Sequence, residues 1–115
     1  MPHQQRDVVK IKEELPDGTI KVHPFLIISC ARANSMENTY VGVMMTASTH
    51  KDAFTFNLND DMFESRLEKG NCQLRLYIVS YFTEVRVSKL ISRMKKVYFK
   101  QVVEEMKNYV FCVDH

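Results

Sequence analysis

Cysteine is scarce in this chain, and its pattern argues against two kinds of site. The sequence holds three cysteines, Cys30, Cys72 and Cys112, which lie far apart and are odd in number. No Cys-x-x-Cys pair occurs, so neither a zinc site nor a disulfide framework is indicated. We expect each cysteine to sit among apolar neighbours, where a reduced thiol behaves as a small hydrophobic side chain. We therefore expect no bound metal and no cofactor.

Long apolar runs are also missing. No run approaches the roughly 18 to 20 residues that cross a bilayer, so no membrane partner is expected. Residues 1–7 lack the apolar stretch of a secretory signal peptide, which leaves the cytoplasm as the expected location. The hydrophobic fraction of 45% and the charged fraction of 26% are typical of soluble globular chains. At 115 residues we expect a single domain, 1–115, with an ordinary core.

The net charge of +2 is distributed unevenly. Residues 1–70 carry eight Lys/Arg against ten Asp/Glu, whereas residues 71–115 carry eight against four. This asymmetry suits contact with a polyanion or with an acidic protein. A solvated, lysine-rich helix face gives the same pattern, so both interpretations stand.

Short apolar runs near the start predict a β-hairpin. Residues 8–12 alternate in part and indicate a strand. The turn signal Pro16-Asp17-Gly18 follows, so the strand from Thr19 is expected to fold back antiparallel. Pro24 cannot donate to a ladder, which predicts an edge position or a bulge there.

The rest of the chain predicts more strands and then a helix. Val102 and its neighbours at helical spacing, Phe99, Val103, Met106 and Val110, predict a closing helix, with another helical turn over 88–93. Asn59 is a candidate N-cap for a short turn or helix through Leu67. The expected fold is mainly β with a C-terminal helix (α+β), a small SH3-like antiparallel β-barrel. The other expected segments are a doubly buried strand over 25–30, a polar loop over 32–38, strands over 40–46 and 54–58, and a strand from 74 that bends near 80 and continues to 87.

Two of these strands place polar side chains where a site would form. The runs 23–29 and 43–46 are nearly all apolar, and each closes on a hydroxyl residue. We expect them to deliver polar groups to one edge of the barrel. His23, which titrates near neutral pH, and Thr46 would then form a compact site for a phosphate.

At this point the sequence resembles the MazF/PemK family of toxins. Arg6-Asp7-Val8-Val9 and then Pro24-Phe25-Leu26-Ile27-Ile28-Ser29 are similar to the family's opening, Arg-Gly-Asp-Ile-Val, a loop, and Arg-Pro-x-x-Val-Ile-Ser. Val41-Gly42-Val43-Met44-Met45-Thr46 resembles the next strand, which ends in threonine or serine. Residues 67–76 and 88–94 are similar to its later strand and to the segment before its closing helix. The match runs in order over nearly the whole chain.

The resemblance implies a CcdB–PemK-type barrel and a sequence-selective, metal-independent endoribonuclease of a toxin–antitoxin module. Such a growth inhibitor is a homodimer, and its partners are single-stranded RNA and a cognate antitoxin. The family's 2′-hydroxyl attack needs a base, donors for the phosphorane and an acid. Carried onto this sequence, the catalytic residues are His23, Thr46 and Arg75. The expected RNA-binding residues are Arg32, Ser48, His50 and Tyr77.

Two departures from the family pattern stand out. His23 occupies the place of the family's arginine, and a neutral imidazole lacks arginine's permanent charge and planar fork. The glycine that the family keeps before its aspartate is missing. The phosphate is then handled by another cation, such as Arg75 or Arg32, or activity is weakened or lost.

Each candidate also has a structural interpretation. His23 can be a surface residue beside Pro24, Thr46 a strand-end hydroxyl, Arg75 a member of an ion pair, and Tyr77 part of the packing. The alternative function is therefore a catalytically degenerate or non-enzymatic binding module, or a CcdB-like toxin with a protein target, on the same barrel.

Overall fold

The computed structural model describes residues 2–47, 52–67 and 72–114. Strands dominate and a helix closes the chain, which confirms the predicted fold class. In chain order the elements are β1 (Asp7–Glu14), β2 (Ile20–Ile27), α1 (Ala31–Glu37), β3 (Thr39–Thr46), β4 (Thr55–Leu58), the 3₁₀ turn η1 (Asp60–Met62), β5 (Cys72–Thr83), the 3₁₀ turn η2 (Glu84–Arg86), β6 (Val87–Arg93) and α2 (Lys96–Tyr109).

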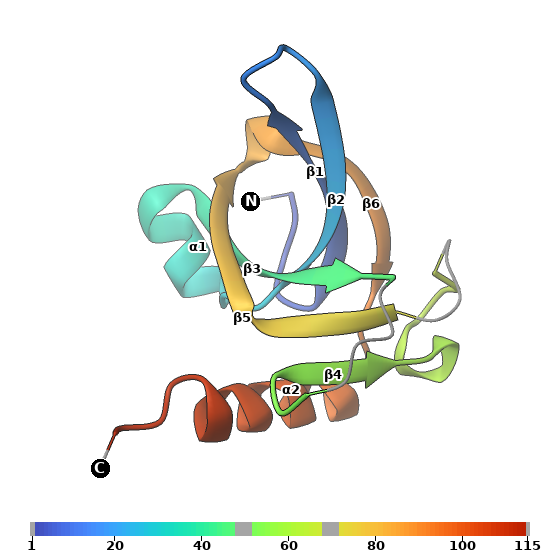
Figure 1. Ribbon diagram of the computed structural model, residues 1–115, viewed down its shortest axis with the longest axis vertical. Coiled ribbons are helices and arrows are strands. Elements are labelled where there is room, and N and C mark those ends of the chain that lie inside the picture. Colours follow the sequence, from blue (N-terminus) through green and yellow to red (C-terminus); the bar gives the residue numbers. More distant parts are fainter. Residues whose placement is uncertain (1, 48–51, 68–71, 115) are drawn as a thin grey trace.

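The strands form one six-stranded sheet with the order β4-β5-β3-β2-β1-β6. Each neighbouring pair is antiparallel. The sheet curls around until β5, β3, β2, β1 and β6 outline a ring in Figure 1. Its edges do not join in a ladder: among the described residues one isolated bridge, Phe63 with Met94, links the segment after β4 to the end of β6. The predicted small barrel is therefore an open one.

The predicted hairpin between β1 and β2 is confirmed. Lys10 pairs with Pro24 and Ile11 with His23. Gly18 has a φ of 88°, a conformation that L side chains rarely adopt. The Asp17 carboxylate accepts hydrogen bonds from the hydroxyl and the backbone N–H of Thr19, and these bonds lower the pKa of Asp17. The turn is thus set by local chemistry.

Pro24 marks the point where β2 gains its second neighbour. The strand lies inside the sheet, so the predicted edge position is wrong for β2 as a whole. However, the described pairs between β2 and β3 begin only at Phe25, which pairs with Met44. The prediction therefore holds for the first half of β2, where Pro24 needs no donor toward β3.

Two apolar clusters fill the two faces of the curled sheet. Because strand residues alternate between faces, Val8 joins one cluster and Val9 the other. The smaller cluster, the ring core, comprises Val9, Ile11, Phe25, Ile27, Tyr40 and Phe82. The larger, the helix-side core, comprises Val8, Leu26, Val43, Met45, Phe56, Leu58, Phe63, Leu67, Leu74, Leu76, Met94, Phe99, Val102 and Met106.

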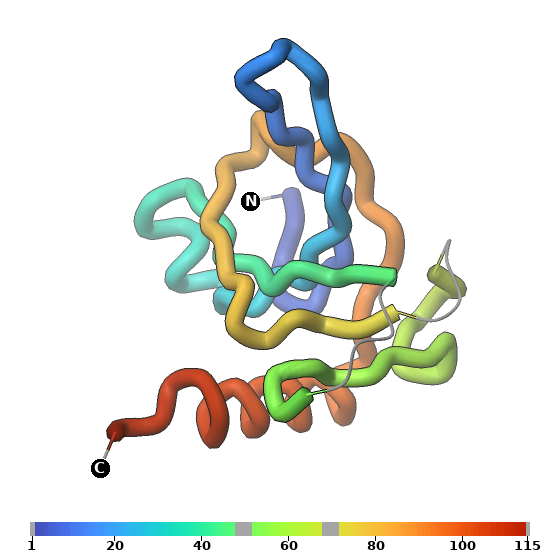
Figure 2. Tube along the Cα trace, viewed as in Figure 1, coloured from blue at the N-terminus to red at the C-terminus, as the bar shows by residue number. Residues whose placement is uncertain are grey.

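The predicted C-terminal helix is confirmed as α2. It contributes Phe99, Val102 and Met106 to the helix-side core, while Val103 is 43% exposed and faces away from the tightest packing. Figure 2 shows α2 running beneath β4. The helix thus covers one face of the β4–β5 end of the sheet.

The prediction of a polar loop over 32–38 is wrong, because nearly all of this stretch belongs to α1. Asn34 is buried there, and its side chain accepts a hydrogen bond from the Ser29 hydroxyl and donates one to the Ser29 carbonyl, at 3.2 Å. Asn38 ends the helix in the left-handed region, with φ of 51°. Asparagine and serine are typical of loops, yet here their hydrogen bonds are internal and hold the helix against β3.

The segments around β5 and β6 differ from the sequence predictions. The helical turn predicted over 88–93 is wrong, because β6 pairs with β1. The strand predicted from 74 to 87 ends at Thr83, where η2 separates β5 from β6. Its bend also comes earlier than expected: Val43 pairs with Val79 but Met45 with Leu74, so the extra residues of β5 lie before position 80.

Three smaller predictions are corrected in part. The doubly buried strand predicted over 25–30 ends at Ile27. Cys30 and Cys112 are exposed, so only Cys72, which is half-buried, packs as a small hydrophobic residue. Asn59 does cap a turn, accepting a 3.0 Å bond from the backbone N–H of Asp61, but η1 ends well before Leu67.

Arg6 adopts a backbone conformation that is rare for a residue with a side chain. Its φ is 80°, in the region that glycine adopts most easily. The guanidinium donates to the Met94 carbonyl at 3.0 Å, and the Arg6 backbone bonds Ile27 and Met94 at 2.8 Å each. These contacts hold a backbone conformation that is unfavourable for an arginine.

Candidate active site

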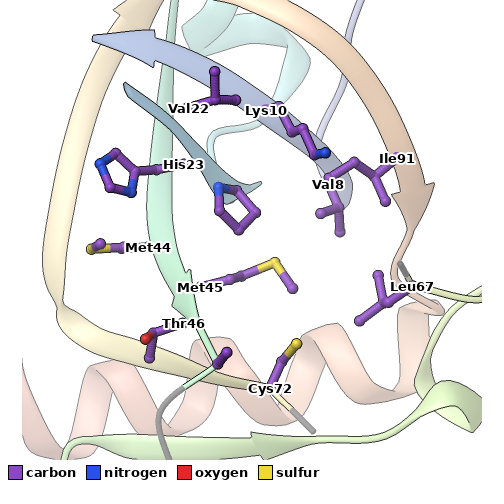
Figure 3. Close-up of a pocket in the computed structure, with 12 residues that line it drawn as sticks. Val8, Lys10, Val22, His23, Met44, Met45, Thr46, Leu67, Cys72 and Ile91 are labelled. Carbon is purple, nitrogen blue, oxygen red and sulfur yellow. The ribbon is translucent and has the colours of Figure 1, made fainter. Parts of the chain in front are cut away.

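The structure brings His23 and Thr46 to one cavity. Strands β2 and β3 are antiparallel, so the start of β2 lies beside the end of β3. Beyond the last described pair, Phe25 with Met44, the two strands part, and a cavity of about 380 Å³ opens there. Both residues line it (Figure 3). The predicted neighbourhood of the two side chains is therefore a real feature of the fold.

The cavity is mostly apolar, with a few polar groups. Such a lining is typical of ligand sites, where scattered polar groups fix the orientation of the ligand. The polar side chains are those of His23, Thr46 and Lys10. The remaining described lining residues are Val8, Val22, Pro24, Met44, Met45, Ala47, Leu67, Cys72 and Ile91.

His23 and Thr46 lie on the same side of the cavity. Figure 3 shows His23, Met44 and Thr46 in a row, with Met44 between the other two. The register explains this row. If the pairing of Phe25 with Met44 is continued by two residues, His23 stands opposite Thr46, and residues opposite each other lie on the same face of a sheet. A phosphodiester that crosses Met44 would meet an imidazole at one end and a hydroxyl at the other.

His23 also faces a carboxylate. Its Nε2 lies 3.9 Å from Glu13 Oε2 on β1, and its side chain is one-third exposed. When the imidazole is protonated, the two groups form an ion pair near the surface.

Lys10 was missed by the sequence analysis as a site residue. It pairs with Pro24, whereas Ile11 pairs with His23, so Lys10 and His23 point to opposite faces of the hairpin. Figure 3 shows Lys10 near Val8 and Ile91, apart from the row of His23, Met44 and Thr46. The signal was present in the sequence: a turn centred on Asp17 places residue 10 opposite residue 24.

Arg75 shares the sheet face of Thr46 but not its cavity. Thr46 pairs with Gln73, and Arg75 lies two residues further along β5, so the three side chains point to one face. Arg75 instead contacts Asp52, with Nη2 4.0 Å from Oδ2, and Tyr77, whose ring centroid lies 5.1 Å from the guanidinium carbon. The pairing of this strand with β3 and β4 is thus defined, while the catalytic role of Arg75 stays a prediction.

The other predicted RNA-binding residues are dispersed. Arg32 is an exposed residue of α1, beside the start of β3 and so at the far end of that strand from Thr46. Tyr77 is exposed on β5 next to Arg75. Ser48 and His50 lie outside the described residues. The structure therefore groups Tyr77 with Arg75 and leaves Arg32 apart.

Ser29 has a structural role and does not lie at the sheet edge that carries His23 and Thr46. Its hydroxyl accepts a 2.9 Å bond from the Val41 backbone and donates to the Asn34 side chain. It lies at the opposite end of β2 from His23, so the expectation that both hydroxyl residues reach one edge is wrong for Ser29. The reason is that β2 and β3 are antiparallel. The C-terminal end of β2, near Ser29, and the C-terminal end of β3, at Thr46, therefore lie at opposite edges of the sheet.

In residues 2–47, 52–67 and 72–114, no group of three or more His, Cys, Asp or Glu side chains is placed to hold a metal ion. Across the same residues, no helix has the length and apolar character needed to cross a membrane.

Comparison with known proteins gives a result only at the level of structure. No family model matches the sequence, and no curated protein matches it significantly. Among solved structures, MazF in a MazE–MazF complex from Deinococcus radiodurans is similar, with a TM-score of 0.76, 11% identity, and coverage of 96% of this chain and 98% of that one.

Two mycobacterial structures are equally similar. One is an endoribonuclease in complex with its cognate antitoxin from a mycobacterial species, with a TM-score of 0.75, 9% identity, and 98% and 99% of the two chains covered. The other is the Mycobacterium tuberculosis toxin MazF-mt6, with a TM-score of 0.73, 12% identity, and 96% and 100% covered. The chain has the fold of the MazF toxins, as the resemblance in its sequence predicted.

Proposed function

We propose that the chain is a toxin of a toxin–antitoxin module that cleaves single-stranded RNA without a metal ion. The observation that carries the proposal is the meeting of His23 and Thr46 at one cavity on a MazF fold. These are the positions where the family keeps a cation and a hydroxyl. The likeness covers almost the whole chain, so the proposed active unit is the single domain 1–115.

The proposed reaction begins with attack by the 2′-hydroxyl on its adjacent phosphate. The hydroxyl proton passes to a base as the 2′-oxygen bonds to phosphorus, and the bond to the 5′-oxygen then breaks with transfer of a proton to that oxygen. The products are a 2′,3′-cyclic phosphate and a 5′-hydroxyl. This sequence needs one base, one acid and donors for the phosphorane, and no water or metal enters it.

His23 and Thr46 supply complementary parts of this chemistry. The protonated imidazole stabilises the phosphorane as a cation in place of the family's arginine, and transfer of a proton to or from the substrate is its alternative role. The Thr46 hydroxyl donates a hydrogen bond to a phosphoryl oxygen, where charge develops. Arg75 remains a predicted third member, because it shares the face of Thr46 without lining the cavity.

The test is cleavage of a long, unstructured RNA with EDTA present. We expect cleavage by the wild type and a loss of roughly a hundredfold in rate for Thr46→Ala, the usual cost of removing one transition-state donor. Thr39→Ala is the matched control, since Thr39 lies at the other end of β3 and donates to the Glu37 carbonyl. Intact RNA with folded wild-type protein would refute the proposal.

The proposed partners are those of a toxin: an RNA substrate, a cognate antitoxin and a second copy of the chain. Solved relatives were captured with antitoxins, which supports the second of these. An RNA target implies work in the cytoplasm. Mixing purified protein with the product of an adjacent gene, and measuring mass by light scattering, tests antitoxin binding and the homodimer together.

A second candidate is a non-catalytic toxin or binding module on the same fold. The histidine in place of arginine favours it, because His23 lacks a permanent charge and lies near Glu13. This candidate predicts growth inhibition or antitoxin binding while RNA stays intact. The cleavage assay therefore separates the two functions.

A further inference from the structure

A second cluster of side chains lies outside the cavity, where β4 meets β5. Phe54 precedes β4, and its carbonyl accepts a 2.9 Å bond from the backbone N–H of Leu76. This bond places the Phe54 ring against Tyr77, with centroids 5.7 Å apart and planes at 78°. The two aromatic residues are 38% and 50% exposed. An edge-to-face pair is thus presented to solvent at the edge of the sheet.

Arg75 fixes one side of this aromatic pair. Its guanidinium carbon lies 5.1 Å from the Tyr77 ring centroid, and Nη2 donates to the Tyr77 hydroxyl. The same nitrogen lies 4.0 Å from Asp52, and the Arg75 side chain is only 15% exposed. The arginine is therefore held in place before any ligand arrives, so little side-chain entropy remains to be lost on binding.

The cluster lies on the strand that neighbours the candidate active site. Thr46 pairs with Gln73, and Tyr77 lies four residues further along β5, at most about 13 Å away along an extended strand. Gln73 and Arg75 occupy the face of Thr46. A strand of RNA with its phosphate at Thr46 would therefore place a neighbouring nucleotide beside the aromatic pair.

We propose that Phe54, Tyr77 and Arg75 form a subsite that stacks an unpaired RNA base next to the cleaved phosphate. This inference rests on the proposed function for its ligand. Exposed aromatic rings with an adjacent arginine suit single-stranded nucleic acid, because every base has a π-face and every nucleotide a phosphate. Arg75 thereby acts at the base and backbone of a flanking nucleotide, and Phe54, which the sequence analysis did not single out, joins the RNA-binding residues.

The test measures binding of a short single-stranded DNA oligonucleotide, which lacks the attacking 2′-hydroxyl and is not cleaved. Fluorescence anisotropy gives its affinity for wild type, Phe54→Ala and Tyr77→Ala. Each substitution should weaken binding about tenfold, in line with the contribution of one stacked base. Tyr81→Ala is the matched control, because Tyr81 is 76% exposed on the same strand. Thermal melting checks that every variant is folded.

Two further measurements separate stacking from general adhesion. On an abasic oligonucleotide, Tyr77→Ala should bind as the wild type does, since no base is there to stack. Arg75→Gln should weaken binding on both probes and reduce the salt dependence by about one phosphate contact. Arg75→Lys, which keeps the charge, should retain the salt dependence but bind less tightly.

The subsite and the catalytic proposal fail separately. Failure of the wild type to bind the oligonucleotide, or unchanged affinity in Phe54→Ala and Tyr77→Ala, overturns the subsite even if RNA is cleaved. A change in oligomeric mass without a change in affinity also overturns it, and assigns the cluster to a protein interface. The subsite is supported if Phe54→Ala and Tyr77→Ala weaken binding of the intact oligonucleotide while Tyr77→Ala leaves binding of the abasic one unchanged. If, in addition, no RNA is cleaved with EDTA present, only the catalytic proposal is rejected.

Discussion

Gln73 on β5 pairs directly with Thr46 on β3, and this pair connects the two parts of the proposed site. On one side of it the end of β3 leads to the cavity lined by His23. On the other, β5 leads to Arg75 and Tyr77. The proposed phosphate site and the proposed base site thus share one sheet face, which is a suitable arrangement for a strand of RNA.

Substitution of His23 by arginine should raise RNA cleavage. Arginine carries a permanent charge and two parallel donors. Charge-assisted hydrogen bonds are stronger than neutral ones, and the difference in free energy corresponds to a gain of about tenfold in the cleavage rate. The rate of cleavage with EDTA, relative to wild type, measures the effect. Glu13→Gln serves as a control, because it removes the carboxylate 3.9 Å from the histidine without adding a donor fork. A lower rate for His23→Arg would show that the imidazole itself moves a proton.

Ser29 and Thr46 should separate stability from activity. Ser29→Ala removes the acceptor of the Val41 N–H and the donor to Asn34, so the free energy of unfolding should fall by about 1 to 3 kcal/mol. Its cleavage rate per folded molecule should be unchanged. Thr46→Ala should slow cleavage per folded molecule by roughly a hundredfold. Equal effects of both on activity would contradict this division.

Substitution of Gly42 by alanine should destabilise the fold. An added Cβ would lie 2.9 Å from Phe82 Cε1, 3.2 Å from Phe25 Cβ and 3.3 Å from the Leu26 carbonyl. Phe82 is buried in the ring core, so strain of about 1 to 3 kcal/mol is expected in urea denaturation. The double variant with Phe82→Leu should recover part of this loss by making room. If Gly42→Ala unfolds at the wild-type urea concentration, the close approach is not rigid.

Substitution of Arg6 by glycine should leave the fold more stable than substitution by alanine. Both substitutions remove the guanidinium bond to Met94, so their difference isolates the backbone. With φ at 80°, glycine should exceed alanine by about 1 kcal/mol in the free energy of unfolding. At Lys12, an exposed position of β1 without positive φ, the order should reverse. The same order at both positions would contradict the assigned conformation.

The buried Tyr40 should make stability fall in alkaline solution. Burial, followed by its hydrogen bond to Glu84 at 2.6 Å, raises the pKa of Tyr40 from 10 to about 12. The folded protein therefore keeps a proton that the unfolded chain releases. This contribution is fully present below pH 10 and is lost as the pH rises through 12, a change of about 2 to 3 kcal/mol.

Urea denaturation followed by circular dichroism across that pH window measures the loss. Tyr40→Phe is the control, because it keeps the ring beside Phe82 and removes the titrating hydroxyl. Its stability should depend less steeply on pH between 10 and 12. Parallel pH dependence of the two proteins would show that other tyrosines or lysines cause the loss.

Much of the fold could be predicted because its signals are local. Alternation marked β1 and β4, helical spacing marked α2, and Pro16-Asp17-Gly18 marked the hairpin turn. The errors fall where tertiary contacts overrule composition. Polar residues formed α1 because Asn34 found internal partners, and the 88–93 segment became β6 because β1 offered a ladder.

The sequence by itself determined the hairpin of the first two strands, the C-terminal helix, and that His23 near the start of one strand and Thr46 at the end of the next lie on neighbouring strands. Only the tertiary structure decided which side chains share a face. Arg75 lies two residues along β5 from Gln73, the partner of Thr46, and does not line the cavity, which opens where β2 and β3 are unpaired before Phe25. Backbone conformation follows from neighbours within a few residues, whereas register and faces follow from how distant strands pack.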